Sequence, residues 1–480
     1  MKEIQNWIDG GFVSGEAATM PVDSPIDGSL LGSMRFASLQ QLDAAVQSAA
    51  QAQKDWAAQT LKARSQVMYD YRGLLRRHRD ELAELCHLEN GKSIVEAHAG
   101  VDRAVELAEF AASTPNWITG RIQAVSRGVE CRDELVPVGV CGSIAPFNFP
   151  IMVPHWTMPL VLVLGNAMIL KPSEFTPLSA LKAAQLLREA GLPDALLQVI
   201  LGAKEIVEGV CDHPGIEAVS FVGSTPVAEL VYRRCAANLK RVATFGGAKN
   251  HIVLLPDADP EMVVRDILAS ATGMSGQRCM AASVLLAVGD TERHIEMLVE
   301  AARDLKPGLD LPPLISQVAV DKIGAYLDRA AQMGARVAVD GRKAAKPQQG
   351  YYVGASIIDY RNGAAQMPEE EIFGPTLEIL GVKNIREAAE VQRRSPYGNA
   401  ASVFTQNGRS AAELLPQLEA GMLGVNIGVP VPRDPFAFGG VKASRFGTAD
   451  ITGPESLPLW TCHRKITTKW NAENKVDWMS

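Results

Sequence analysis

The chain has 480 residues, a length beyond which a single hydrophobic core stops growing, so we expect two or three domains. Apolar residues make up 47% and charged residues 21% of the sequence, which is typical of a globular protein rather than a disordered or fibrous one. Acidic residues outnumber basic residues by 54 to 47. This balance argues against a nucleic acid or an anionic membrane as the partner.

The cysteines and the first residues bear on the cellular compartment. Seven cysteines are scattered along the chain and never spaced as CxxC, which predicts reduced thiols, no disulfide framework and no metal site. The opening MKEIQNWIDGGF lacks the apolar core of a signal peptide and the pattern of a transit peptide, so we expect a cytoplasmic protein. The most apolar stretch, 151–170, is interrupted by prolines and polar residues, which favours a buried helix and strand over a membrane span.

The first part of the chain changes from a helical to a strand pattern. Apolar residues recur at helical spacing from 38 to 112, and Gly91 suits a helix C-terminus. Residues 121–140 instead alternate apolar and polar side chains, which predicts a strand ribbon able to pair with another subunit. The tail at 463–478 alternates in the same way and is expected to add a strand to that ribbon.

Two series of short apolar runs, each alternating with helical segments, follow the ribbon. The first, from 167 to 245, contains AMILK, LQVIL, IEAVSFV and RVATF, and Thr176 before Pro177 predicts a helix start with Thr176 as its N-cap. The second, from 251 to 427, contains HIVLL, SVLLAVG, ARVAVD, LEILGV, ASVFT and GMLGVNI. This alternation predicts an α/β fold with two open parallel sheets, each covered on both faces, and a cleft between them.

Two short motifs carry groups suited to covalent chemistry. Cys279 lies in SGQRCMA, where small residues let a ligand approach closely and Arg278 favours a thiolate. The local sequence leaves open whether Cys279 is a nucleophile or a packed core residue. Asn148, in APFNFP, either holds a turn through its amide or donates to an oxygen that becomes negative when a thiolate adds to a carbonyl.

Two further motifs are suited to a nucleotide. Lys171 and Glu174, in LKPSEFTP, follow a predicted strand, and together they suit the ribose hydroxyls of an adenine nucleotide. A carboxylate there repels a 2′-phosphate, which favours NAD over NADP, although a solvated lysine and an ordinary first-turn acid are the alternatives. Gly223 and Ser224, in SFVGSTPVAELV, precede a predicted helix whose free N–H groups suit a pyrophosphate or simply a serine cap. The sequence contains no GxGxxG fingerprint.

Taken in order, six motifs resemble the aldehyde dehydrogenase superfamily over nearly the whole chain: APFNFP, LKPSE, SFVGS, GGAKN, GQRCMA and EEIFGP. GAKNH, GQRCMA and GMLGVNIGVPVP look like its methylmalonate-semialdehyde dehydrogenase branch, which makes a CoA thioester. The resemblance implies a dinucleotide-binding domain at 1–118 and 138–247 and a catalytic domain at 248–447. It also implies an oligomerisation arm at 119–137 and 460–480 that builds homodimers or homotetramers.

The resemblance also assigns roles to single residues. It makes Cys279 the nucleophile and Asn148 the oxyanion donor. The residues that it implies for NAD binding are Phe147 beside the cofactor, Lys171 and Glu174 on the adenosine ribose, Gly223 and Ser224 on the pyrophosphate, and Glu371 and Phe373 on the nicotinamide ribose and ring.

The substrate end of the site is read from two arginines. Arg103 and Arg278 match positions where the semialdehyde branch holds a substrate carboxylate, and a guanidinium pair would also suit a sulfonate or a phosphate. The alternative for Arg103 is a charge on a helix surface. The segment DPFAFGGVKASRFG, 434–447, looks closer to general aldehyde dehydrogenases, which implies a retuned substrate end.

The choice of acyl acceptor follows from missing carboxylates. Hydrolytic members carry a glutamate in a motif like ELGGK, and Phe245 falls at that position, while a second carboxylate of some members would fall near Cys462. Without a base for water, the thioester should persist until a thiol attacks it. The sequence therefore predicts NAD-dependent, CoA-acylating oxidation of a short anionic aldehyde resembling malonate or methylmalonate semialdehyde. A hydrolytic semialdehyde or sulfo-aldehyde dehydrogenase and a non-enzymatic oligomer with the same fold stay open.

Overall fold

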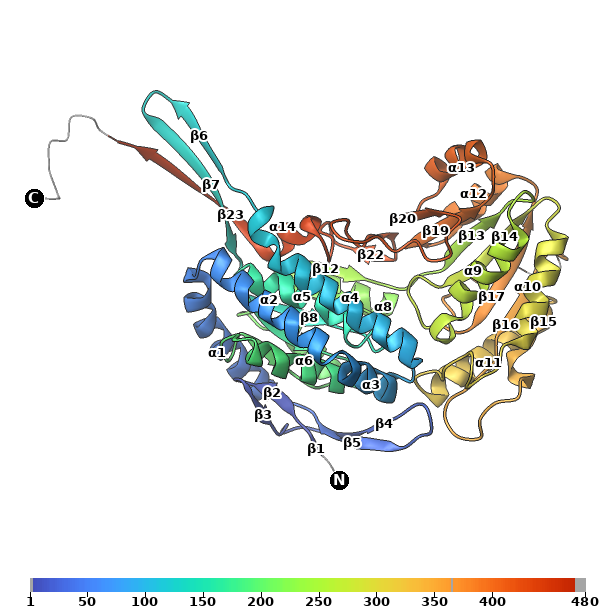
Figure 1. Cartoon of the computed structure of the whole chain (residues 1–480), viewed down its shortest axis with the longest axis horizontal. Helices are drawn as coiled ribbons and strands as arrows, with labels where there is room; N and C mark the ends of the chain where they lie inside the picture. Colours follow the sequence, from blue (N-terminus) through green and yellow to red (C-terminus); the bar gives the residue numbers. More distant parts are fainter. Residues whose placement is uncertain (1–2, 364–365, 471–480) are drawn as a thin grey trace, which may run out of the picture.

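The structure is a computed structural model that describes residues 3–363 and 366–470, and two open sheets form its two halves (Figure 1). The larger sheet has eight strands in the order β22-β12-β11-β8-β9-β10-β2-β3. In chain order they are β2 (Asn6–Ile8), β3 (Gly11–Val13), β8 (Val140–Ile144), β9 (Ala167–Lys171), β10 (Leu197–Val199), β11 (Ala218–Val222), β12 (Arg241–Phe245) and β22 (Arg445–Phe446).

The strands from β12 to β10 are parallel as expected, but both margins of this sheet are antiparallel, which corrects the purely parallel prediction. At one margin β2 and β3 form a hairpin whose turn residues Asp9 and Gly10 have φ of 51° and 74°. An Asp-Gly pair favours this turn because both central residues must adopt a left-handed conformation. The hairpin signal is in the sequence and was missed.

Helices cover both faces of the larger sheet, and the alternation of side chains along β8 shows how. The Ser143 hydroxyl lies 3.1 Å from the Thr157 hydroxyl on α5, whereas a Cβ added at the preceding residue, Gly142, would lie 2.7 Å from Val210 on α7. Successive strand residues point to opposite faces, so α5 and α7 lie on opposite sides. The helices in this half are α1 (Leu39–Ala58), α2 (Leu61–Arg77), α3 (Arg79–Asn90), α4 (Ile94–Ala112), α5 (Met152–Val163), α6 (Leu178–Glu189), α7 (Lys204–Asp212) and α8 (Thr225–Ala237).

Several local predictions in this half can be scored. The helical segment at 38–112 is confirmed as α1 to α4, and Gly91 is the C-cap of α3 with φ 81°. The apolar stretch at 151–170 is a buried helix and strand, α5 and β9. The prediction of Thr176 as an N-cap is wrong, because α6 starts two residues later with Pro177 at its N-cap. In the described part of the chain, no helix is both long enough and apolar enough to cross a bilayer.

The smaller sheet has seven strands in the order β15-β16-β17-β14-β13-β19-β20. In chain order they are β13 (Asn250–Leu254), β14 (Ala282–Val288), β15 (Arg336–Val339), β16 (Ser356–Asp359), β17 (Thr376–Val382), β19 (Ala400–Phe404) and β20 (Met422–Val425). The helices are α9 (Pro260–Thr272), α10 (Glu292–Asp304), α11 (Gln317–Gln332), α12 (Ile385–Arg394) and α13 (Gly408–Leu414). All neighbouring strands are parallel except the margin pair β15 and β16, and β16 was not predicted.

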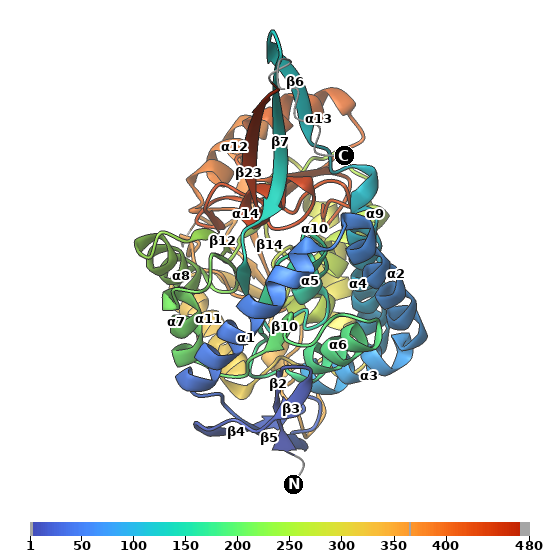
Figure 2. The same cartoon turned by 90° about the vertical axis from the view of Figure 1, so that its left-hand side faces the viewer.

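A three-stranded sheet projects from the body as an arm (Figures 1 and 2). It consists of β6 (Arg121–Ser126), β7 (Val129–Pro137) and β23 (Thr461–Lys469), and β7 lies in the middle. The predicted ribbon and its added C-terminal strand are therefore confirmed up to Lys469, since β23 pairs with β7 along its whole length. Residues 471–480 of the predicted arm lie outside the described residues.

The remaining elements are short. The N-terminal strands β1 (Glu3–Ile4), β4 (Thr19–Asp23) and β5 (Leu30–Arg35) form a separate sheet, and β18 (Tyr397–Gly398) pairs with β21 (Val441–Lys442). Helix α14 (Leu457–Trp460) precedes β23 and buries Trp460 completely in the core of the larger half. This buried tryptophan fixes the base of the arm to the body, since aromatic side chains of this size bury a large apolar area.

Candidate active site

A cavity of about 600 Å³ is lined by residues from both halves of the molecule, and Cys279 is one of them. In open α/β sheets ligands bind outside the carboxyl ends of the strands, and Ile144, Lys171 and Val222, the last residues of β8, β9 and β11, all line this cavity. It brings together all the predicted site residues except the two arginines: Phe147, Asn148, Lys171, Glu174, Gly223, Ser224, Cys279, Glu371 and Phe373.

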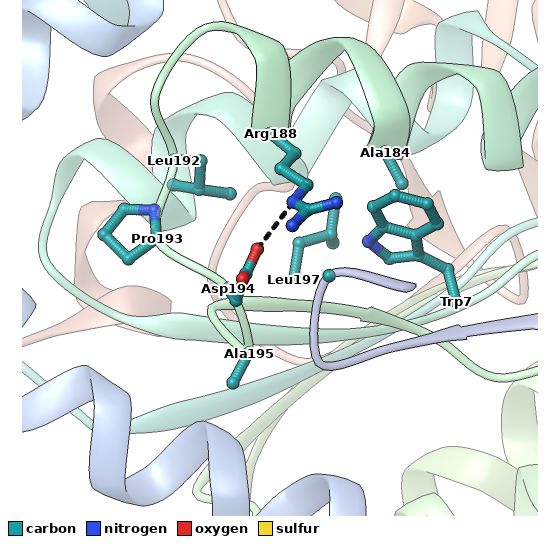
Figure 3. Close-up of a pocket in the computed structure, with 9 residues that line it drawn as sticks. Trp7, Ala184, Arg188, Leu192, Pro193, Asp194, Ala195 and Leu197 are labelled. Carbon is teal, nitrogen blue, oxygen red and sulfur yellow. Dashed lines mark ion pairs between the residues drawn. The ribbon is translucent and has the colours of Figure 1, made fainter. Parts of the chain in front are cut away.

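A second hollow, next to Trp7, is too small to be a substrate site. Its volume is about 10 Å³, room for about one water molecule. Figure 3 shows the Arg188 side chain beside Trp7, joined to Asp194 by an ion pair of 2.9 Å.

The loop that presents Cys279 is strained. It follows α9, and Met274 and Ser275 each have φ 50°, in the left-handed region that ordinary residues avoid. Gly276 has φ 71°, and a Cβ there would lie 2.0 Å from the carbonyl oxygen of Gly374. Such strain of about 1–3 kcal/mol per residue persists only where packing over-determines the backbone, and it gathers at functional sites.

The surroundings of Cys279 favour the neutral thiol over the thiolate. Burial, with a smaller contribution from the nearby charge of Glu371, raises its pKa to about 12, although N–H groups of Cys279 and Met280 hydrogen-bond to the sulfur and act in the opposite direction. The carbonyl oxygen of Cys279 accepts from the side-chain amides of Asn250 and Asn399, both at 2.8 Å. These two asparagines fix the backbone of the nucleophile. The sequence analysis assigned a role to neither, although Asn250 ends the GGAKN motif.

The amide of Asn148 is held in place by the loop that carries Cys279. Asn148 is 5% exposed, follows β8 in the loop 145–150, and its Nδ2 donates to the carbonyl oxygen of Gln277 at 3.0 Å. Gln277 is itself buried, and its Oε1 accepts from the N–H of Ile315 at 3.0 Å. An asparagine amide carries two hydrogens, so this bond orients the group and uses one of them.

The part of the cavity next to the larger sheet can hold a ribose and phosphates. Lys171 ends β9, and its Nζ lies 2.8 Å from a carboxylate oxygen of Glu174. Ser224 is the N-cap of α8, yet its side chain makes no capping hydrogen bond. The start of α8, at the positive end of the helix dipole, lies at the cavity wall and suits an anion.

Glu371 and two aromatic rings form another part of the cavity wall. The Oε1 of Glu371 accepts from the N–H of Ala248 at 2.9 Å, and burial raises the pKa of this carboxyl group to about 7. The rings of Phe147 and Phe373 meet edge to face with centroids 6.0 Å apart. A flat aromatic ligand between these groups would contact apolar surface and a carboxyl group that changes its charge near neutral pH.

The two predicted substrate arginines do not line this cavity. Arg103 forms ion pairs with Glu106 and Asp434, each at 2.8 Å, and Arg278 pairs with Glu96. Both guanidinium groups are therefore already matched by carboxylates of the chain. A substrate carboxylate would have to compete with Asp434 or Glu96 for these arginines.

Neither residue at the positions expected for a hydrolytic base carries a carboxylate. Phe245 is buried with its ring centroid 5.9 Å from that of Phe438, and Cys462 lies in the arm strand β23. In the described residues, the carboxylates that line the cavity are Glu174, Glu208 and Glu371.

Comparisons with known proteins identify the family of the chain. The model of the aldehyde dehydrogenase family matches residues 12–466. A malonate-semialdehyde dehydrogenase of Geobacillus thermodenitrificans is 40% identical to the chain, and the alignment covers 98% of this chain and 99% of the relative.

Solved structures give the same result. The crystal structure of a methylmalonate-semialdehyde dehydrogenase from Oceanimonas doudoroffii superposes with a TM-score of 0.95 at 37% identity, covering 98% of this chain and 99% of the other. The structure of an aldehyde dehydrogenase from Bacillus cereus in complex with NAD+ has a TM-score of 0.91 at 29% identity, with 98% and 97% covered. These matches confirm the predicted fold: the chain belongs to the aldehyde dehydrogenase family and is an enzyme of that family.

Proposed function

We propose that the enzyme oxidises a short semialdehyde of the malonate type with NAD, through a thioester on Cys279. The observation that carries this proposal is the shared cavity, which holds a cysteine on a strained loop and an asparagine amide fixed to that loop. Relatives named for malonate and methylmalonate semialdehydes support the substrate class.

The chain's own residues suit each chemical step. After the Cys279 thiol has lost its proton to solvent, the thiolate adds to the aldehyde carbon, and the new oxyanion accepts hydrogen bonds from the Asn148 amide and the Cys279 N–H. Removing one such donor costs about 2.7–4 kcal/mol of barrier in comparable enzymes. Loss of hydride from the carbon then leaves a thioester on Cys279.

The cavity fits NAD. Lys171 and Glu174 suit the adenosine ribose, Gly223 and Ser224 at the start of α8 suit the pyrophosphate, and Phe147, Glu371 and Phe373 suit the nicotinamide riboside. When bound, the nicotinamide supplies the hydride acceptor. The Glu174 carboxylate favours NAD over its 2′-phosphorylated form.

We infer that coenzyme A is the acyl acceptor. Phe245 and Cys462 supply no carboxylate to activate water, and a thiol near neutrality is partly a thiolate and strongly nucleophilic. The CoA sulfur attacks the thioester carbon, and the Cys279 thiolate leaves. With malonate semialdehyde, loss of CO2 makes the product acetyl-CoA.

Hydrolysis is a second candidate, favoured by one observation. Glu371 lies in the same cavity as Cys279, and its pKa near 7 would let its carboxylate take a proton from water at neutral pH. Such a base would release a free acid without coenzyme A.

We assign the domains and the arm by sheet membership. Residues 1–118 and 138–247, which supply every strand of the larger sheet except β22, would bind the dinucleotide, and residues 248–447, which contain the smaller sheet, would carry the nucleophile. The arm, from 119–137 and 460–480, would join subunits into a homodimer or homotetramer, because β6 is exposed along its whole length.

The test is NADH formation by purified enzyme, with malonate semialdehyde, sulfoacetaldehyde and propanal, each with and without coenzyme A. We expect multiple turnovers with malonate semialdehyde only when coenzyme A is present, acetyl-CoA by mass spectrometry, and no activity in Cys279→Ala. Full turnover without coenzyme A, yielding malonate, would reject the acylating reaction in favour of hydrolysis. Turnover by Cys279→Ala would reject the thioester mechanism altogether.

A further inference from the structure

The turn between α3 and α4 contacts the loop that carries Asn148 through two side chains. Asn90, the last residue of α3, donates from Nδ2 to the carbonyl oxygen of Phe147 at 2.9 Å. Lys92 donates from Nζ to the next carbonyl oxygen, that of Asn148, also at 2.9 Å. Asn90 is 1% exposed and Lys92 is 2% exposed, so both contacts are made in the protein interior.

Gly91, between these two residues, fixes the shape of the turn. It adopts the left-handed conformation with φ 81°, and a Cβ at this position would lie 2.5 Å from Pro313 and 2.9 Å from Pro25. Only glycine tolerates both the backbone conformation and the close packing. This turn places the side chains of Asn90 and Lys92 against the consecutive carbonyl groups of Phe147 and Asn148.

The same segment also holds the loop that carries Cys279. Glu96, in the first turn of α4, accepts from the N–H of Met274 at 2.8 Å and pairs with Arg278. One short stretch, 90–96, therefore touches the proposed oxyanion donor's loop on one side and the nucleophile's loop on the other.

Stability alone does not explain a lysine at position 92. Burying an ammonium group is costly, and the ionisable groups around it are Cys86, Glu89, Glu96 and Arg278, none of which forms an ion pair with it in the described structure. Its nitrogen contacts a backbone carbonyl and lies 4.5 Å from the ring centroid of Phe149. A methionine would fill similar volume without this cost.

We propose that Lys92, assisted by Asn90, is a positioning residue that sets where the Asn148 amide lies relative to the Cys279 sulfur. This inference rests on the proposed function, in which the Asn148 amide donates a hydrogen bond to the oxyanion. The reaction is sensitive to this geometry: a displacement of about 1 Å in a reacting site can cost roughly a hundredfold in rate.

The test compares Lys92→Met and Lys92→Arg with a matched control, Lys240→Met. Lys240 also donates from a partly buried ammonium to two backbone carbonyls, those of His213 and Ile216, but it does not line the cavity. We expect Lys92→Met to lower kcat roughly tenfold to a hundredfold, with the aldehyde KM changed less than about twofold. Lys92→Arg keeps a donor and should recover part of kcat, while Lys240→Met should keep the kcat of the parent enzyme.

The outcomes separate this inference from the proposed function. A parent enzyme that needs Cys279, together with a Lys92→Met variant of unchanged kcat, would overturn the positioning role alone. An equal loss of kcat in Lys240→Met would also overturn it, since the effect would then be one of general stability. Turnover that survives Cys279→Ala overturns the function and this inference together. If Lys92→Met does not fold, Asn90→Ala provides the same test, with a loss of kcat expected and an unchanged kcat contradicting the proposal.

Discussion

At the scale of single residues, one thiol and one carboxyl group in the cavity have ionisation equilibria that depend on each other. Burial raises the pKa of Cys279 to about 12 and that of Glu371 to about 7, and the charge of Glu371 adds to the effect on the thiol. Each group disfavours its charged form because the cavity wall is poorly solvated. The free enzyme therefore holds its nucleophile mostly as an unreactive thiol.

Alkylation of Cys279 should report this coupling. In Glu371→Gln the negative charge is gone, so the thiol pKa falls and iodoacetamide reacts faster, by roughly twofold to tenfold at pH 8.5, since one pKa unit corresponds to a tenfold change in thiolate. At pH 6, Glu371 is already protonated and the two proteins should react alike. The rate is measured by mass spectrometry of the Cys279 peptide over time. Equal rates at both pH values would show that the Glu371 charge does not act on the sulfur.

At the scale of elements, helix α6 depends on a residue from another helix. Its own N-terminus has no side-chain cap, and Glu89 of α3 accepts from the N–H groups of Leu178 and Ser179 at 2.6 and 3.1 Å. Glu89 is fully buried and also accepts from the Ser179 hydroxyl. It thus satisfies donors that a helix start leaves unpaired and ties α6 to α3.

Removing this cap should weaken the fold without touching the cavity. We expect Glu89→Ala to lose about 1–3 kcal/mol of stability, because buried N–H groups at the start of α6 lose their acceptor. The drop is measured as a lower thermal unfolding temperature. Glu81→Ala on the same helix, whose side chain is partly exposed, serves as the control and should change the unfolding temperature much less. Equal effects of the two changes would contradict the capping role.

At the scale of the whole molecule, the arm exposes strand edges and apolar side chains that no other part of the described chain covers. Its strands β6 and β23 have free outer edges in the described structure, and β6 exposes Ile122 and Val125 at 64% and 55%. An exposed strand edge with apolar side chains is a template for pairing with another chain. This geometry supports the proposed subunit contact.

Charges placed on the arm should therefore change the oligomeric state. The double variant Ile122→Lys with Val125→Lys is expected to elute as a smaller species than the parent in size-exclusion chromatography with light scattering, because two desolvated ammonium groups oppose association. Val318→Lys, at a site that is 77% exposed on α11, is the control and should keep the parent mass. An unchanged mass in the arm variant would place the subunit contact elsewhere.

The sequence determined the local structure and the list of chemical groups. Periodicity predicted the helices α1 to α4, the parallel core strands and the arm, because each depends on which residues one face must bury. Ordered motifs predicted the family, and the resemblance predicted part of the cavity lining but wrongly added Arg103 and Arg278. The pairing of β2 and β22 with the parallel strands, strand β16 and the start of α6 were missed, since pairing at a margin and a cap donated by Glu89 depend on partners distant in the chain. The β2–β3 hairpin was missed although its Asp-Gly turn is a local signal.

Only the tertiary structure decided what each group faces. It placed Glu371 in the same cavity as Cys279, matched Arg103 and Arg278 with carboxylates, and set Lys92 against the Asn148 carbonyl. None of these contacts follows from spacing along the chain. The pKa of a group and the strength of its charge interactions depend on burial and on neighbours in space. Burial and spatial neighbours are fixed only when the chain folds.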